Sequence, residues 1–586
     1  MIEKLHTILL WTALIHGCQT ATQASSCKSI PGDATWPSAT AWRLLNETVD
    51  GRLLIASPPG SVCHTDQTTY DDDRCRAVQS AWSSEFFHAD DPVSVEWNNW
   101  TNDSCLPDSR AHCTANGYPT FVVNATTPLH VKAGIDFARR HSIRLVVKNS
   151  GHDYLGRSTA PNSLSIWVHH MRGVAWHPTS FTPKGCHFSI GGLAMTAGAG
   201  TQMIDAYRLA AEMNRTVVGG NGRSVALGGY VTGGGHSILS PRHGLAVDQI
   251  LEMEMVAPSG DVLTLNECQN ADLFWAMRGG GGSTFGVLTS VTMKTYESPR
   301  VMNMQFSLTT SAENDHALDA VAYVLGQFPG LVDSGISGYP VVVNSVPIWP
   351  GSNQTVPVSG MTGKLAMLDA TSPENMTQLF APILAYLHET WPGEYSFLAD
   401  ITSYPTFYAW YLENYDPTPA GYDNLLGSRL LDRRALTANA TATRWALERF
   451  AAGGQATVLL VSGKGVFDAR PRGGGTSVSP AWRRAYAHAA ISAPFLPLNE
   501  TAQREAIERV NSATEALREL APDSGAYINE ANPWEPDWQR TFWGDNYPRL
   551  LQIKRAVDPE DVFWCTPCVG SEGWEERENR LCRVRA

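Results

Sequence analysis

The sequence predicts an α+β protein of more than one structural unit, and three observations support this fold class. First, a chain of 586 residues exceeds the size at which one hydrophobic core stops growing, so about two to four units are expected. Second, residues 120–147 follow a strand, helix and strand pattern in turn. Third, residues 300–521 mix strands and helices without the glycine-rich loops found before them, which indicates a second domain.

The first unit begins near residue 118. Residues 120–125 have a strand pattern, Thr127 can cap a helix with Pro128 in its first turn, and residues 143–147 are typical of a buried strand. This unit leads into a polar loop that contains Gly151 and His152.

A second α/β stretch follows. It contains a helix pattern at 204–213 and a glycine-rich segment at 219–235. Residues 250–256 and 261–265 flank a Pro-Ser-Gly turn and predict a hairpin. A further helix pattern ends at four consecutive glycines, 279–282, and residues 286–296 alternate as a strand does.

Composition and charge restrict the classes of function. Apolar residues make up 43% and charged residues 17% of the chain, which is typical of a globular protein. The net charge of −13 and the lack of a dense Lys/Arg tract exclude nucleic acid as an expected partner.

The N-terminus has the pattern of a signal peptide, predicted to span residues 1–24. Lys4 precedes an apolar stretch at 8–15, and small and polar residues follow. That stretch is too short for a membrane span, and no later stretch reaches 18 apolar residues, so no span is predicted. N-glycans are predicted from nine sequons, at Asn46, Asn99, Asn102, Asn124, Asn214, Asn353, Asn375, Asn439 and Asn499.

The cysteines agree with an oxidising compartment. Cys18 would leave with the signal peptide, so ten of the eleven cysteines would remain. The pairs Cys63/Cys75 and Cys105/Cys113 enclose short polar loops and are predicted disulfides that pin an N-terminal extension, residues 25–117. Cys565 and Cys568 lack a second half-site for zinc, so we predict disulfides to other partners, with Cys582 as one candidate.

Three loops place small residues where a backbone can approach an anion closely. They contain Ser150-Gly151, Gly228-Gly229 with residues 233–235, and residues 279–282. None matches the G-x-G-x-x-G dinucleotide pattern or the phosphate loop of ATPases. Together, in one α/β region, they predict a large phosphorylated cofactor.

Several motifs carry a resemblance to a known family. SGHDYLGRS, LGGYVTGGGHS, VDQILEMEMVAPSGDVLTLN and LFWAMRGGGGSTFGVLTSV stand in the order and spacing of the vanillyl-alcohol-oxidase superfamily. The C-terminal segment that begins YINEANPWEP resembles the berberine-bridge-enzyme branch. Within that branch the sequence looks similar to the fungal isoamyl-alcohol-oxidase-like group, several members of which act in secondary metabolism.

The resemblance implies a fold and a cofactor. A two-part PCMH-type FAD-binding domain would comprise residues 118–299 and a berberine-bridge-type segment, 526–586, which returns to it. The inserted α+β substrate domain, residues 300–525, would be built on an antiparallel sheet. The implied cofactor is FAD and the implied partner is a small-molecule substrate. The signal peptide sends such a protein into the secretory pathway, to the exterior or to a vacuolar lumen.

The resemblance also implies cofactor-binding residues. His152 matches the histidine that bonds to the 8α-methyl group of the flavin. Gly222 stands where many relatives have a second, cysteine attachment, so a single attachment through His152 is expected. The other cofactor-binding positions are Ser150, Gly151, Asp153, Val225, Gly228, Gly229, Thr232, Gly234, His236, Asp248, Asn546 and Tyr547, and for His236 packing is an equal alternative.

Two C-terminal residues are the predicted catalytic groups. Sugar-oxidising relatives use a tyrosine base in a Tyr-x-Asn-Tyr motif, and this chain has Glu530 at the last position. We predict Glu530 as the base, with its pKa raised by burial, and Tyr527 as its neighbour or alternate. Pairing of Glu530 with a cation is the equal alternative.

The predicted reaction is hydride transfer from an alcohol or a small natural product to FAD, with molecular oxygen reduced to H2O2. Val225 favours oxygen as the acceptor, because valine at this position is typical of the oxidases that the chain resembles. A dehydrogenase or desaturase with another acceptor is one alternative. A secreted glycoprotein that acts only by binding is another. No metal site is predicted.

Overall fold

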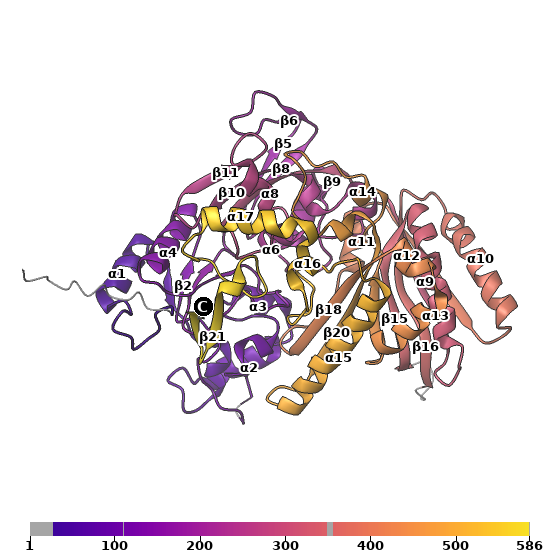
Figure 1. Ribbon diagram of the computed structural model, residues 1–586, viewed down its shortest axis with the longest axis horizontal. Coiled ribbons are helices and arrows are strands. Elements are labelled where there is room, and N and C mark those ends of the chain that lie inside the picture. The colour runs from indigo at the N-terminus through magenta and orange to yellow at the C-terminus, as the bar shows by residue number, and fades with distance from the viewer. Residues whose placement is uncertain (1–26, 109, 349–355, 585–586) are drawn as a thin grey trace, which may run out of the picture.

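Three main β-sheets organise the residues that the computed structural model describes, 27–108, 110–348 and 356–584. Two of them lie in the half of the molecule that holds the N-terminal and C-terminal segments, drawn in indigo to magenta and in yellow (Figure 1). The third, drawn in orange and salmon, forms the other half. The α+β fold class is confirmed.

The first sheet has the strand order β1-β2-β4-β3, and β2, β4 and β3 run parallel. Helix α4, Pro128–Arg140, connects β2 to β3 and begins as predicted: the Thr127 side chain accepts a hydrogen bond from the His130 backbone N–H. A cap of this kind is worth about 1 kcal/mol. The strands are β1 Leu53–Ile55, β2 Phe121–Asn124, β3 Leu145–Lys148 and β4 Leu164–Trp167.

The second sheet is antiparallel with the order β11-β10-β12-β8-β5. The predicted hairpin is present between β10 and β11, where Gly260 adopts φ +87°, a conformation rare for residues with a Cβ. The strands are β5 Val174–His177, β8 Ala194–Gly198, β10 Ile250–Val256, β11 Val262–Leu265 and β12 Val287–Lys294. The helices of this region are α5 Met203–Glu212, α6 Leu227–Gly233, α7 Ser240–His243 and α8 Ala271–Ala276.

The third sheet has seven antiparallel strands in the order β17-β14-β16-β15-β19-β20-β18. Its strands are β14 Val301–Ser311, β15 Ile336–Ile348, β16 Val356–Leu368, β17 Ser396–Tyr404, β18 Asp423–Asp432, β19 Gln455–Leu459 and β20 Ala485–Phe495. Its helices are α9 Ala317–Asp333, α10 Glu374–Thr390, α11 Phe407–Asn414, α12 Arg433–Thr437, α13 Ala440–Phe450, α14 Lys464–Phe467 and α15 Glu500–Leu520.

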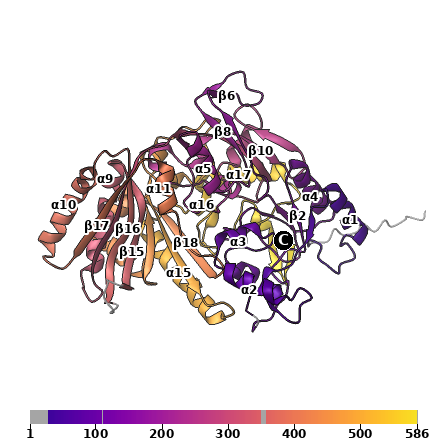
Figure 2. The same cartoon turned by 180° about the vertical axis from the view of Figure 1, so that it is seen from behind.

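The two faces of this sheet have different environments because side chains alternate along each strand. Helices α9, α13 and α15 lie along one face (Figures 1 and 2), where Val342, Val458 and Ile491 are buried in a common core. Neighbouring residues such as Val341 and Thr457 line a cavity on the other face.

The N-terminal extension contains α1 Ala39–Thr48, α2 Asp72–Ala81 and α3 Glu85–Asp90. The predicted disulfides Cys63–Cys75 and Cys105–Cys113 are confirmed. The prediction that Cys565 and Cys568 have other partners is wrong, since a tight turn brings these two together. The remaining disulfides join Cys186 to Cys268 and Cys27 to Cys582.

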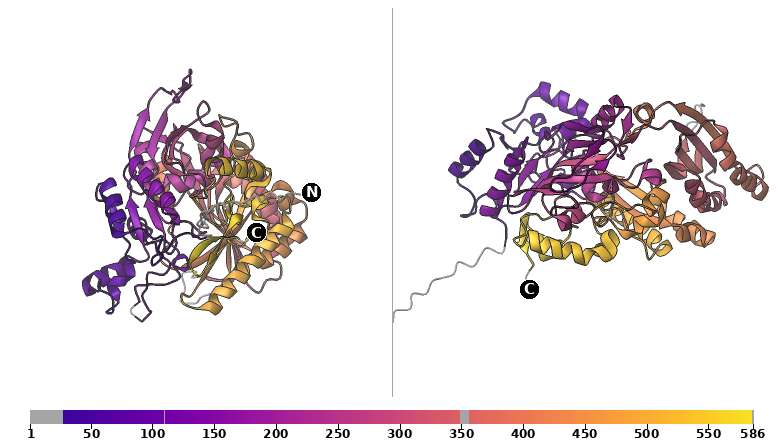
Figure 3. Two further views of the ribbon diagram at one scale, coloured as in Figure 1. Left: turned by 60° about the vertical axis from the view of Figure 1, so that its left-hand side comes forward. Right: turned by 90° about the horizontal axis from the view of Figure 1, so that it is seen from above.

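The C-terminal segment, drawn in yellow, returns to the half of the molecule that holds the N-terminal segment (Figures 1 and 3). There α17, Tyr547–Val557, packs on α8. The buried Lys554 of α17 donates to the backbone oxygen of Thr284, 2.9 Å away. Its helices and strands are α16 Trp538–Trp543, α17 Tyr547–Val557, β21 Trp574–Arg577 and β22 Arg580–Arg583.

Within the described residues, no helix is both long and apolar enough to cross a membrane. The predicted signal peptide and the sequon at Asn353 fall outside the described residues. The short strands of the first half are β6 Ser180–Phe181, β7 Ile190–Gly191, β9 Arg215–Thr216 and β13 Tyr296–Glu297.

Candidate active site

A cavity of about 1060 Å³ lies between the glycine-rich loops of the first half and the open face of the seven-stranded sheet. This volume is at the upper end of the range typical of small-molecule and cofactor sites, roughly 300–1,000 Å³. The cavity therefore has room for a large cofactor beside a substrate.

Most of the predicted site residues meet in this cavity, although they come from three distant parts of the sequence. The loop after β3, the segment around α6 and the C-terminal segment each contribute to the wall. The predicted residues that line it are Ser150, His152, Asp153, Val225, Gly228, Gly229, Thr232, His236, Tyr527 and Glu530, together with Gly222.

Five predicted cofactor residues do not line the cavity, and the side chains of three of them, Asp248, Asn546 and Tyr547, have partners elsewhere. Asp248 is buried, and its carboxylate pairs with both terminal nitrogens of Arg483 at 2.7 and 2.8 Å. Asn546 donates from Nδ2 to the backbone oxygen of Val478, and the Tyr547 hydroxyl pairs with Glu572. The structure gives these three side chains supporting contacts within the fold.

Gly151 and Gly234 shape the wall without lining it. Gly151 has φ +89°, and a Cβ there would lie 3.2 Å from the Cα of Val95 in the N-terminal extension. Gly234 has φ +134°, and its Cβ would lie 3.4 Å from the Tyr527 ring. Both positions require glycine because of backbone conformation and close packing.

Two carboxylates and one hydroxyl surround the side chain of His152. Its Nε2 lies 2.8 Å from Glu96 Oε1, 2.6 Å from Ser224 Oγ and 4.0 Å from Glu85 Oε2. The Ser224 hydroxyl donates to Glu85 at 2.9 Å. All of these contacts converge on one nitrogen of the imidazole.

Burial and charge act in opposite directions on this cluster. Burial alone would lower the pKa of His152, but the adjacent Glu96 carboxylate, followed by Glu85, raises that pKa above its ordinary value. Burial raises the pKa of Glu96, and the contact with His152 offsets that effect only in part.

Two histidines hold the carboxylate of Glu530. Its Oε1 lies 2.9 Å from His236 Nε2, and its Oε2 lies 2.8 Å from His488 Nε2 on β20. Burial alone would raise the pKa of Glu530, but the two imidazoles hold it well below its ordinary value. The predicted raised pKa of Glu530 is therefore wrong, because His488 and His236 were not recognised as its partners. Burial lowers the pKa of His488.

Tyr527 is a buried hydrogen-bond acceptor beside this cluster. Its hydroxyl oxygen accepts from the Gly235 backbone N–H at 3.2 Å and from Asn529 Nδ2 at 3.0 Å. Burial raises the pKa of Tyr527 well above its ordinary value, so the hydroxyl stays protonated at neutral pH.

The wall fits the phosphates and ring system of FAD on two observations. Around Gly229 there is open space where a Cβ would point. Asn149 Oδ1 and Arg157 Nη1 are buried and have no hydrogen-bond partner among the described residues, and both side chains line the cavity. Arginine is a strong donor to phosphate, and a glycine without obstruction lets the backbone approach a ligand.

Sequence reasoning missed several residues of the site. Glu85 and Glu96 come from the N-terminal extension, which carries no motif, and Ser224 sits between recognised positions. His488 had a usable signal, because it is a lone histidine among small and apolar residues in a strand pattern. The full list of missed residues is Glu85, Glu96, Asn149, Arg157, Ser224 and His488.

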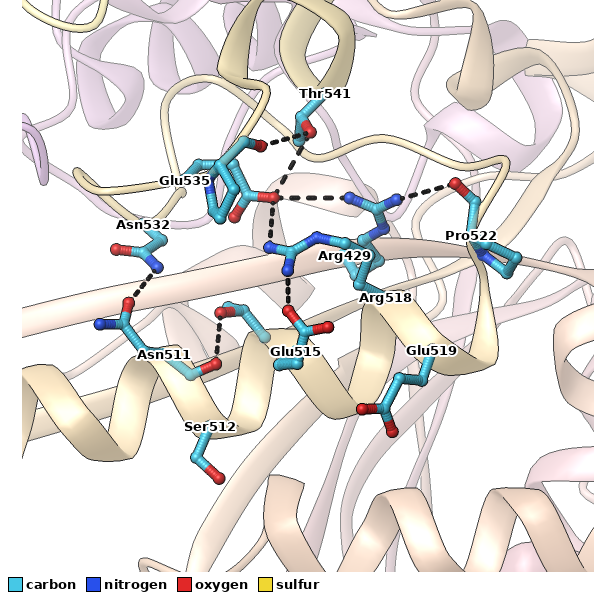
Figure 4. Close-up of polar contacts among 12 residues, drawn as sticks. Arg429, Asn511, Ser512, Glu515, Arg518, Glu519, Pro522, Asn532, Glu535 and Thr541 are labelled. Atoms are coloured by element: carbon cyan, nitrogen blue, oxygen red, sulfur yellow. Dashed lines mark hydrogen bonds and ion pairs between the residues drawn. The ribbon is translucent and has the colours of Figure 1, made fainter.

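A buried ion cluster joins Glu535, in the segment that carries Tyr527 and Glu530, to α15 and β18 (Figure 4). Glu535, whose side chain is 1% exposed, lies 2.9 Å from Arg518 of α15 and 3.5 Å from Arg429 of β18. Arg429 also donates to backbone oxygens that precede the segment, including that of Pro522. Arg429 of β18 thus contacts this segment on both sides of Tyr527 and Glu530.

Comparison with known proteins gives consistent matches. A family model described as an FAD binding domain matches residues 119–266, and one described as berberine and berberine like matches residues 526–569. An uncharacterized FAD-linked oxidoreductase of Arthroderma benhamiae is 35% identical over 583 residues, 96% of this chain and 97% of the relative. The VAO-type flavoprotein oxidase VAO615 of Thermothelomyces thermophilus is 33% identical over 95% of this chain and 96% of that relative.

Comparison with solved structures gives the same family. The VAO-type flavoprotein MtVAO713 of Myceliophthora thermophila C1 superposes with a TM-score of 0.87 at 30% identity, over 96% of this chain and all of that one. Fold and cavity thus define an FAD-binding flavoprotein enzyme. The chain belongs to the FAD-linked oxidoreductases of the vanillyl-alcohol-oxidase type with a berberine-bridge-like C-terminal segment.

Proposed function

We propose that this protein is an oxidase that carries FAD bonded to His152. It transfers a hydride from an alcohol or a small natural product to the flavin and reduces O2 to H2O2, in a role suited to fungal secondary metabolism. One observation carries the proposal: a single cavity unites His152 and the glycine loops with the His236–Glu530–His488 cluster. When bound, FAD accepts the hydride and passes the two electrons to oxygen.

A single covalent attachment is supported by Gly222. A Cβ at this position would lie 3.8 Å from Cε1 of His152 and 3.0 Å from Cγ2 of Val225. Glycine has no atom that can bond to the flavin, so His152 is the sole attachment point that the predicted positions provide.

The substrate proton is proposed to pass to the His236–Glu530 pair. Glu530 on its own is a weak base, because its pKa lies well below the ordinary value. We propose that Nδ1 of His236 takes the proton: Glu530 Oε1 lies 2.9 Å from Nε2 of that imidazole, and Nδ1 is buried without a hydrogen-bond partner among the described residues. Glu530 then stabilises the resulting imidazolium, and Tyr527 remains a protonated donor at the cavity wall.

Oxygen as acceptor is supported by the small side chain of Val225 in the cavity wall and by the relative named an oxidase. Delivery to the secretory pathway is supported by the five disulfides and by the exposed sequon residues Asn102, Asn214, Asn375, Asn439 and Asn499.

The test combines flavin retention with turnover. Purified protein is denatured in acid, and yellow colour is expected to stay with the polypeptide. Peroxide release is then measured for panels of sugars, alcohols, alkaloids and polyketides, with and without oxygen. Turnover with a dye acceptor but no peroxide in air would replace the oxidase proposal by a dehydrogenase. A colourless protein with no bound flavin would contradict the proposal altogether.

A further inference from the structure

The N-terminal extension makes close contact with the loop that carries His152. The backbone N–H of Glu96 donates to the Gly151 oxygen at 3.2 Å, and the Trp97 indole donates to the His152 oxygen at 3.3 Å. The Trp97 ring stacks on Tyr154 with centroids 4.7 Å apart. These contacts deliver the Glu96 side chain to the histidine from outside the FAD-binding sequence motifs.

The carboxylate of Glu96 lies close enough to His152 to take a proton from it. It is 3% exposed, it lines the cavity, and its Oε1 lies 2.8 Å from Nε2. No hydrogen bond engages Nδ1 of His152 among the described residues, whereas Nε2 contacts both Glu96 and Ser224. The structure thus leaves Nδ1 for bond formation and places Nε2 2.8 Å from the carboxylate of Glu96.

We propose that Glu96 is the base that activates His152 to bond to the flavin, with Nδ1 as the attacking atom. This inference rests on the covalent linkage of the proposed function. A bond forms between Nδ1 and the 8α carbon, and one C–H bond of the 8α-methyl group breaks. The Nε2 proton of His152 passes to Glu96. The electron pair left on the ring system goes to O2, which takes up the two released protons and becomes H2O2.

Glu85 is the less suitable base of the two carboxylates. Its Oε2 is 4.0 Å from His152 Nε2, beyond hydrogen-bond distance, and it accepts from Ser224 at 2.9 Å. Its Oε1 accepts from Arg223 Nε at 3.0 Å. Glu85 therefore orients Ser224, and Ser224 helps to hold the imidazole ring in place.

Burial supports the assignment of Glu96. A carboxylate whose pKa is raised by burial holds a proton more strongly and is better matched to an imidazole donor. The distances give the same order of the two carboxylates, because Glu96 Oε1 lies 2.8 Å from His152 Nε2 and Glu85 Oε2 lies 4.0 Å from it.

The experiment follows flavin attachment instead of turnover. Full-length chain is produced without flavin in a riboflavin-requiring host, FAD is added in air, and samples are denatured in acid over time. Total bound FAD is measured before denaturation and covalent FAD after it. We expect Glu96→Gln to bind FAD but to attach it roughly 100-fold more slowly than wild type, as for loss of a general base. Glu85→Gln is the matched control, with a clearly smaller slowing expected.

The outcomes separate the two proposals. If the wild-type protein binds FAD but releases it on acid denaturation, the covalent linkage to His152 is itself overturned. If FAD is covalently bound in the wild type and Glu96→Gln attaches it at the wild-type rate, the role of Glu96 is overturned and the linkage to His152 stands. If Glu96→Gln does not accumulate as folded protein, Glu96→Asp carries the test, because it keeps the charge and withdraws the oxygen from Nε2. It should attach FAD slowly, and unchanged attachment in that variant would refute the assignment.

Discussion

The cavity contains two clusters built from the same residue types in opposite proportions. Around His152, one imidazole is surrounded by the carboxylates of Glu85 and Glu96. Around Glu530, one carboxylate is held by the imidazoles of His236 and His488. The minority group is the one whose charged form is favoured: the pKa of His152 is raised and that of Glu530 is lowered. In each cluster the two neighbours of opposite charge outweigh burial and set the direction in which the pKa of the central group moves.

This difference suits the two tasks that we propose. Attachment needs a histidine with a base beside it, and Glu96 supplies that base. Substrate oxidation needs an imidazole that can take a proton and then be stabilised as a cation, and an ionised Glu530 supplies that stabilisation.

The largest expected effect is at the first cluster. His152→Ala should abolish covalent FAD, because no other cavity residue is proposed to bond to the flavin. Acid precipitation of the purified variant should give a colourless pellet and release any bound FAD to the supernatant. A yellow pellet would show that another residue forms the bond.

A large effect on turnover is expected at the second cluster. Glu530→Gln removes the charge that stabilises His236 as a cation, so the rate of flavin reduction by substrate should fall about 10²–10⁴-fold. Anaerobic stopped-flow measurement follows this rate, and covalent FAD should be retained. Loss of attachment with unchanged reduction would reverse the roles assigned to the two clusters.

An intermediate effect is expected at Val225, which lines the cavity near Gly222. Val225→Leu should slow reoxidation of the reduced flavin by oxygen on the order of tenfold, equivalent to about 1.4 kcal/mol in the barrier. Stopped-flow mixing with oxygenated buffer measures this step, and Val225→Ala serves as the control with less bulk. Equal reoxidation rates in all three proteins would remove Val225 from the oxidase argument.

The smallest effect on chemistry is expected at the ion cluster behind the site (Figure 4). Glu535→Gln leaves Arg429 and Arg518 without their shared carboxylate, which should cost roughly 3 kcal/mol of stability. Thermal unfolding should show a lower midpoint, while the folded fraction keeps its covalent FAD. Loss of attachment at full stability would show that this cluster acts on the site directly.

Local sequence patterns predicted the parts of the fold that depend on local chemistry. The capped helix after Thr127, the hairpin at Gly260 and the disulfides over short loops each rest on neighbouring residues, and each is present. The prediction of other partners for Cys565 and Cys568 is wrong because their short spacing does not reveal the turn that brings the two sulfur atoms together. Cys27 and Cys582 lie at opposite ends of the chain, so their pairing depends on the complete fold.

A place in the cavity wall was predictable where a motif marks the residue, as at His152 and Gly228. The partners that set the electrostatics of the site were not predictable from the sequence, because Glu96 lies far from His152 in the chain and His488 lies far from Glu530. Burial alone gave the wrong direction for the pKa of Glu530, since its two histidine partners come from separate segments. Asp248 and Tyr547 lie within the segments that carry the resemblance, but their side chains have partners within the fold, Arg483 and Glu572.

The attachment of FAD to His152 is tested most directly by mass spectrometry of a proteolytic digest. We expect the peptide containing His152 to carry the full mass of FAD, and fragmentation to place the flavin on the imidazole. We expect no flavin on any peptide that contains a cysteine. An unmodified His152 peptide together with free FAD, or flavin on any other residue, would contradict the attachment of FAD to His152.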